Sequence, residues 1–142
     1  MADKIEITID VIVHATEDTK KIFQAFEEML ELNEGDFSIQ KTTGHFDNPI
    51  IVLNSKIVKK QAQNLIEKIL GSLSREQTEQ MIDEIAERTI DSRFHMRLGK
   101  QEMIKGNLVF DKKDPIKMKI HTPVYNKKET VKIFTEIFQK AN

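Results

Sequence analysis

The stretch that decides the fold is IEITIDVIV, residues 5–13. Its odd positions are all apolar and β-branched, and three of its four even positions are polar. Successive side chains of a strand point to opposite faces, so this alternation predicts a strand with one buried face. The same pattern returns in RFHMRL, residues 93–98, and in IKMKIH, residues 116–121. Together these segments indicate a sheet with its core on one side.

Other segments repeat apolar residues at helical spacing instead. We expect helices over about 16–32, 59–70, 74–89 and from 126 onward, with a short helical turn at 100–105. Local signals indicate the ends of these helices. We expect Thr16 to cap the first helix, Gly71 to end the second, Ser74-x-x-Gln77 to form a capping box at the third, and Asn126-x-x-Glu129 to cap the last. Shorter strands are expected at 37–41, 50–57 and 108–110.

The resulting order is β-α-β-β-α-α-β-β-β-α, in which hairpins alternate with helices. This order predicts an α+β fold of two layers, a mostly antiparallel sheet with helices mainly on one face. No linker or repeat divides the chain, so residues 1–142 are expected to form a single domain.

Composition narrows the class of protein. The chain is 39% apolar and 32% charged, contains no cysteine and has no apolar run long enough to cross a membrane. We therefore expect a cytoplasmic protein without disulfides, signal peptide or membrane association.

The net charge of −1 conceals an uneven distribution of charge along the chain. Residues 1–36 hold three Lys and ten Asp or Glu, whereas residues 93–132 hold eleven Lys or Arg and four Asp or Glu.

The sequence offers no recognisable catalytic chemistry. It lacks phosphate-binding glycine loops, nucleophile elbows and metalloprotease motifs. Its four histidines are isolated in sequence; three of them could converge on a metal, but capping or solvated histidines are the simpler interpretation. We expect no catalytic residues, no metal and no cofactor.

The two basic strands carry the most informative pattern. If Phe94, Met96 and Leu98 face the core, then Arg93 and Arg97 share the other face. By the same logic Lys117 and Lys119 face outward. Rows of like charge are costly unless an anion is nearby. That anion is either an RNA phosphate backbone or, in the alternative interpretation, acidic groups of the protein itself.

The connection from Thr42 to Pro49 is the second informative feature. Gly44 permits a positive φ, and Asn48 precedes a proline, which favours an extended conformation. His45 and Asn48 would lie at a constrained tip, able to hydrogen-bond either a ligand or the backbone of the turn itself.

Three stretches carry a family resemblance: VIVHATED at 11–18, TGHFDNPI at 43–50, and RLGKQ at 97–101 followed by Gly106. In this order they resemble a family of small archaeal RNA-binding domain proteins, also described as predicted exosome subunits. That family more often has Gly where this chain has Asp47, and Asp where it has Gly99. The resemblance implies a fold similar to a large-subunit ribosomal protein that contacts 5S RNA.

We therefore expect a non-enzymatic protein that binds structured RNA, in exosome-associated RNA processing or ribosome assembly. The expected phosphate contacts are Arg93, Arg97, Lys100, Lys117 and Lys119. His45, Asn48 and Gln101 are candidates for directional hydrogen bonds. The alternative is a protein–protein interaction module, a homodimer or a docking subunit of an RNA-processing complex. An enzyme with an unrecognised site is the third interpretation.

Overall fold

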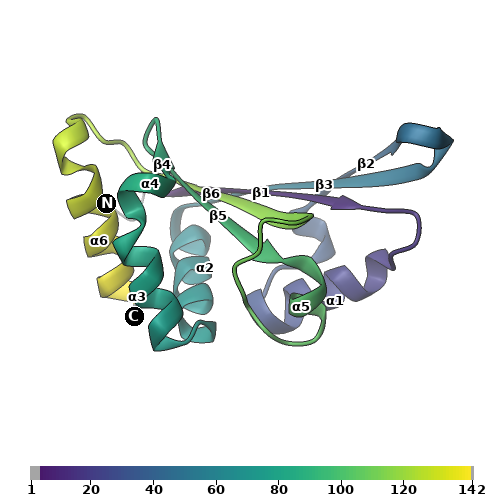
Figure 1. Cartoon of the computed structure of the whole chain (residues 1–142), viewed down its shortest axis with the longest axis horizontal. Coiled ribbons are helices and arrows are strands. Elements are labelled where there is room, and N and C mark those ends of the chain that lie inside the picture. The colour runs from purple at the N-terminus through teal and green to yellow at the C-terminus, as the bar shows by residue number, and fades with distance from the viewer. Residues whose placement is uncertain (1–3, 142) are drawn as a thin grey trace.

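The computed structural model describes residues 4–141, so residues 1–3 and 142 of the expected domain lie outside it. One antiparallel sheet with strand order β2-β3-β1-β6-β5-β4 forms one layer, and the helices lie on one side of it (Figure 1). The expected α+β class and helix placement are confirmed.

The strands are β1 (Glu6–Val13), β2 (Ser38–Thr43), β3 (Pro49–Val58), β4 (Thr89–Ile90), β5 (Arg93–Gly99) and β6 (Pro115–His121). The helices are α1 (Thr19–Leu30), α2 (Lys59–Ser72), α3 (Arg75–Asp83), α4 (Ile85–Arg88), α5 (Lys100–Ile104) and α6 (Thr130–Ala141). Short 3-10 turns are η2 (Glu34–Asp36), η3 (His45–Asp47) and η4 (Lys127–Glu129).

The hydrophobic core lies between the sheet and the helices. From β1 it takes the odd residues of the alternating stretch, each at most 4% exposed. Phe94 of β5 packs against Phe134 and Phe138 of α6, with ring centroids 5.9 and 5.0 Å apart. The faces predicted from the alternation of β1, β5 and β6 are therefore confirmed.

Several helix boundaries differ from the sequence-based expectation. Asp18, not Thr16, caps α1, because its carboxylate accepts the backbone N–H of Lys20 at 2.9 Å. Helix α2 continues through Gly71 to Ser72. The Ser74 capping box is confirmed, but the helix breaks at Glu84, which separates α3 from α4. Asn126 caps η4, and α6 follows it.

The strand expected at 108–110 is reduced to a single bridge between Leu98 and Phe110. A two-residue strand, β4, which the sequence analysis did not predict, forms the other end of the sheet. Among residues 4–141, no helix is both long and apolar enough to cross a membrane.

The face of the sheet opposite the helices is uncovered, and we call it the open face. The β2–β3 hairpin extends beyond the body of the protein, and its tip rises on the open-face side (Figure 1). At the opposite end the β4–β5 turn and the start of the C-terminal helix also rise above the central strands (Figure 1). At both ends of the open face, therefore, the backbone rises above the central strands (Figure 1).

Candidate functional site

Four cationic side chains lie together on the open face, and we call them the basic row: Arg93, Arg97, Lys117 and Lys119. The strand register explains the grouping, because Arg97 pairs with Lys117 and His95 pairs with Lys119 across β5 and β6. Residues directly opposite each other in an antiparallel pair have Cβ atoms about 5 Å apart. Three of the four side chains are exposed, and Lys119 is half-buried. The basic row is therefore one continuous surface.

Acidic groups on the next strand form no ion pair with the basic row. Among the ion pairs of residues 4–141, none involves a member of the basic row. Asp10 of β1 lies opposite Lys117, but its carboxylate accepts a hydrogen bond from the Asn54 amide. Glu6 forms an ion pair with Lys56 of β3, at 3.8 Å. An anion approaching the open face would thus meet cations that the protein leaves without a carboxylate partner.

His95 lies among the cations of the basic row, and their charges affect the pKa of its imidazole. Burial lowers the pKa of its imidazole, and Lys119, Arg97 and Arg93 lower it further. A bound anion would reverse the effect of those three cations. His121, at the end of β6, contacts the backbone oxygen of Ser92 through Nδ1 at 3.2 Å.

Two neighbouring hollows share Arg97 and Lys112. The first, of about 560 Å³, lies over β1, β3 and β6 and is lined by Ile12, Val52, Arg97, Lys112 and Lys117 among others. The second, of about 640 Å³, reaches His95 and Phe110. Arg97 therefore lies between two depressions, and each also has carboxylates in its lining: Asp10 and Asp114 in the first, and Glu84, Glu87 and Asp111 in the second.

Lys100, expected to contact phosphate, is instead a buried structural residue. It is 2% exposed, and its ammonium donates to Glu17 at 2.8 Å, to Asp114 at 2.9 Å and to the backbone oxygen of Ile12 at 2.6 Å. All three ammonium hydrogens are thus used inside the protein. The amide of Gln101, expected to bind a ligand, donates to Glu17 as well. The structure corrects the assignment of Lys100 and ties Gln101 to the same cluster.

This cluster also contains the one group of described residues with the donors for a metal ion. The ligand atoms of His14, Glu17 and Asp114 lie within 4.8 Å of one another. The Lys100 ammonium already bonds both carboxylates, so a cation would have to displace it. Burial opposes ionisation of Asp114, but hydrogen bonds from Lys100 and His14 hold the pKa of its carboxyl below the usual value. The cluster links the β1–α1 connection, α5 and the end of the β5–β6 connection through hydrogen bonds and ion pairs.

The hairpin tip, residues 44–48, differs from its expected form. Gly44 is extended, with φ −89°, whereas Phe46 and Asp47 adopt left-handed φ values of 66° and 57°. The Gly44 N–H donates to the Asn48 backbone oxygen at 2.8 Å and closes the turn. The side chains of His45 and Asn48 are exposed, and among the described residues neither forms a side-chain hydrogen bond. They remain free to meet a ligand, far from the basic row.

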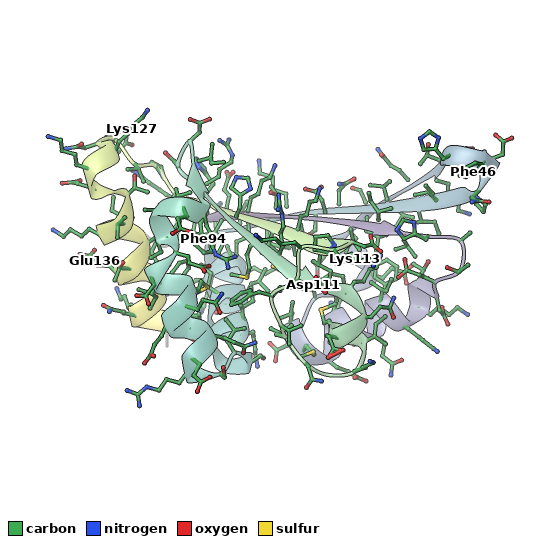
Figure 2. All side chains as sticks on the ribbon, viewed as in Figure 1. Phe46, Phe94, Asp111, Lys113, Lys127 and Glu136 are labelled. Atoms are coloured by element: carbon green, nitrogen blue, oxygen red, sulfur yellow. The ribbon has the colours of Figure 1, made fainter. Side chains whose placement is uncertain are left out.

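Sequence reasoning missed Phe46. Most phenylalanines of the chain belong to the core at helical or strand spacing, but Phe46 is 93% exposed at the end of the hairpin. Figure 2 shows its ring at the tip, at the opposite end of the molecule from Lys127. The signal that could have identified it was its position inside a turn, between Gly44 and Pro49, where no core is within reach.

Comparison with known proteins gives a consistent result. A family model described as RNA binding matches residues 6–122. A protein of Pyrococcus abyssi named as an RNA-binding protein is 31% identical over 144 residues, 92% of this chain and 92% of that protein. An uncharacterised protein of Methanocaldococcus jannaschii is 31% identical over 137 residues, 89% of this chain and 91% of that protein. The crystal structure of a DUF54 protein from Sulfolobus solfataricus, 24% identical, has a TM-score of 0.76 and covers 96% of this chain and 97% of its own. That structure shares the fold.

Proposed function

Because this chain belongs to the RNA-binding family, we propose that it binds structured RNA through the basic row on its open face, without catalysis. The observation that carries the proposal is the row itself. Three exposed cations and the half-buried Lys119 share one face of the sheet, and no carboxylate among the described residues forms an ion pair with them. A polyanion that presents phosphates at regular intervals matches such a surface.

Backbone and shape recognition suits this surface better than base-by-base reading. The basic row contains no aromatic side chain that could stack a series of bases. Arg93 and Arg97 present planar guanidinium groups that fit phosphate oxygens in pairs, and Lys117 and Lys119 add point charges. We propose that this binding serves RNA processing or ribosome assembly.

The test is the salt dependence of binding to a folded RNA fragment. If four cations meet phosphates, the slope of log affinity against log salt should be roughly −3 to −4. Arg97→Ala should weaken binding and bring the slope closer to zero by about 1. Arg75→Ala is the matched control, because Arg75 is 93% exposed but lies at the start of α3, in the helix layer.

No binding to any folded RNA at about 50 mM salt, or equal losses for the two arginine variants, would overturn the proposal.

The second candidate function is a protein–protein contact, either a homodimer or docking on a subunit of an RNA-processing complex. All six residues of the end strand β2 are exposed, so its free edge is open to pairing with another strand. Light scattering in a salt series separates the two functions. A dimer in which basic strands meet the acidic N-terminal third of a second copy should dissociate at high salt.

A further inference from the structure

The side chains of the open face are mainly cationic near β5 and apolar where β1 meets the β2–β3 hairpin. Beside the basic row, Ile12 of β1 pairs with Val52 of β3, and Ile12 is 43% exposed. These two apolar side chains line the same hollow as Arg97 and Lys117. The hollow therefore has a charged side, where the cations exceed the carboxylates Asp10 and Asp114, and an apolar side formed by Ile12 and Val52, which we call the apolar wall.

Apolar side chains continue from this wall along β3 toward the hairpin tip. Ile50, half-buried on the same face of β3, is the next residue in that direction, and a Cβ on Gly44 would collide with its side chain. Phe46 lies beyond it, and the hairpin carries the ring above the level of the central strands (Figure 2). Asn54 of β3 lies level with Lys117 across the sheet. From Asn54 to Pro49, at the start of β3, the strand extends about 17 Å along its axis. A ligand of several nucleotides can therefore reach both the basic row and Phe46.

A nucleotide combines the two chemistries of this surface, an anionic phosphate and a flat apolar base. In an RNA double helix the bases are stacked and paired, so a protein meets mostly phosphates and 2′-hydroxyls. Only unpaired bases can lie on aliphatic side chains or stack on an exposed aromatic ring. The apolar wall and Phe46 are superfluous for a fully paired duplex, and the cations beside them disfavour a purely apolar protein partner.

From this arrangement we infer that the RNA ligand is a junction between a duplex and an unpaired strand. The duplex phosphates lie on the basic row, and the unpaired bases run over Ile12 and Val52 toward Phe46, which stacks on one of them. This inference rests on the proposed function and specifies its substrate.

The experiment compares two RNAs by fluorescence anisotropy: a blunt duplex of about 16 base pairs, and the same duplex with an unpaired extension at each end. The wild-type protein should bind the extended duplex more tightly. Phe46→Ala should weaken that binding by at least about fivefold and leave the blunt duplex within about twofold, because one stacked base is lost. Phe46→Tyr should restore the preference.

Two isoleucines supply a matched pair on opposite faces of the sheet. Ile12 is 43% exposed on the open face, and Ile39 is 44% exposed on the reverse face, where it pairs with the buried Leu53. Ile12→Ser should weaken binding of the extended duplex, and Ile39→Ser should not.

Equal affinity of the wild-type protein for both RNAs would overturn the inference and leave the proposed function standing. The inference also fails if Phe46→Ala leaves the affinity for both RNAs unchanged, or if it lowers both affinities by the same factor. Dissociation of an oligomer by this variant would not rescue it. If the wild-type protein binds neither RNA, the proposed function itself fails.

Discussion

Arg97 and Lys100 lie three residues apart, and they occupy opposite environments. Arg97 is exposed on the open face, where its cross-strand neighbour is Lys117. Lys100 is buried at the start of α5 and bonded to two carboxylates and a backbone oxygen. One residue leaves its charge available to a ligand, and the other uses its charge to hold three segments together. A count of positive charges along the chain cannot distinguish these roles.

The largest expected effect separates the two residues by stability. Lys100→Met should lower the free energy of unfolding by about 2–3 kcal/mol, since it leaves the largely buried carboxylate of Glu17 without its cationic partner. The loss should stay below that of a fully buried pair because the Asp114 side chain is 43% exposed.

Arg97→Met is the control, with an expected change below about 1 kcal/mol. Urea unfolding of both variants gives the measurement. Equal losses would show that Arg97 too is a structural residue and that the comparison is wrong.

A smaller effect should come from His95, between the two arginines of β5. Its folded-state pKa lies below the ordinary value of 6.5, so the unfolded chain binds a proton more readily. The stability contribution of a neutral His95 is complete above that pH and is lost as the pH falls through the folded pKa. His95→Gln should flatten this decline below about pH 6.5, measured by urea unfolding.

The same histidine should link RNA binding to pH. Phosphates beside Lys119, Arg97 and Arg93 offset the cations that depress the pKa, so binding takes up a proton. Affinity should therefore rise as the pH falls in that window, and less so for His95→Gln. A pH-independent affinity would mean that the phosphates do not reach β5.

The smallest expected effect concerns His45 at the hairpin tip. Because its side chain is exposed and lacks a hydrogen-bond partner among the described residues, His45→Ala should change stability by less than about 0.5 kcal/mol. The change should appear instead as weaker RNA binding, because the exposed side chain is free to contact a ligand. If His45→Ala binds RNA as tightly as the wild-type protein does, the tip contributes through Phe46 rather than through His45.

Periodicity predicted what depends on local alternation. The buried and exposed faces of β1, β5 and β6 follow directly from their sequence, and so does the clustering of Arg97 with Lys117 once the strands pair. What it missed depends on contacts distant in sequence. The partner of Lys100, Glu17, is 83 residues away, and no spacing rule connects them.

Local signals also failed where two of them competed. Thr16 and Asp18 are both good helix caps, and the sequence alone does not show that the Asp18 carboxylate is the one that accepts the Lys20 N–H. At the tip, Gly44 is the residue that tolerates a positive φ most easily, yet Phe46 and Asp47 adopt it. The family that the sequence resembles more often has Gly at position 47, which agrees with this backbone conformation.

The position of β1 has a consequence for how the chain folds. Strand β1 is synthesised first but lies in the middle of the sheet, where it pairs with β3 and, through Glu6 and His121, with the last strand. A ribosome releasing this chain therefore exposes one edge of β1 until residues 115–121 emerge. Contacts of such long sequence separation slow folding and leave a transient strand edge open to wrong pairing. The surface proposed to hold RNA spans β1, β6 and β5, so it exists only after the last strand has joined the first.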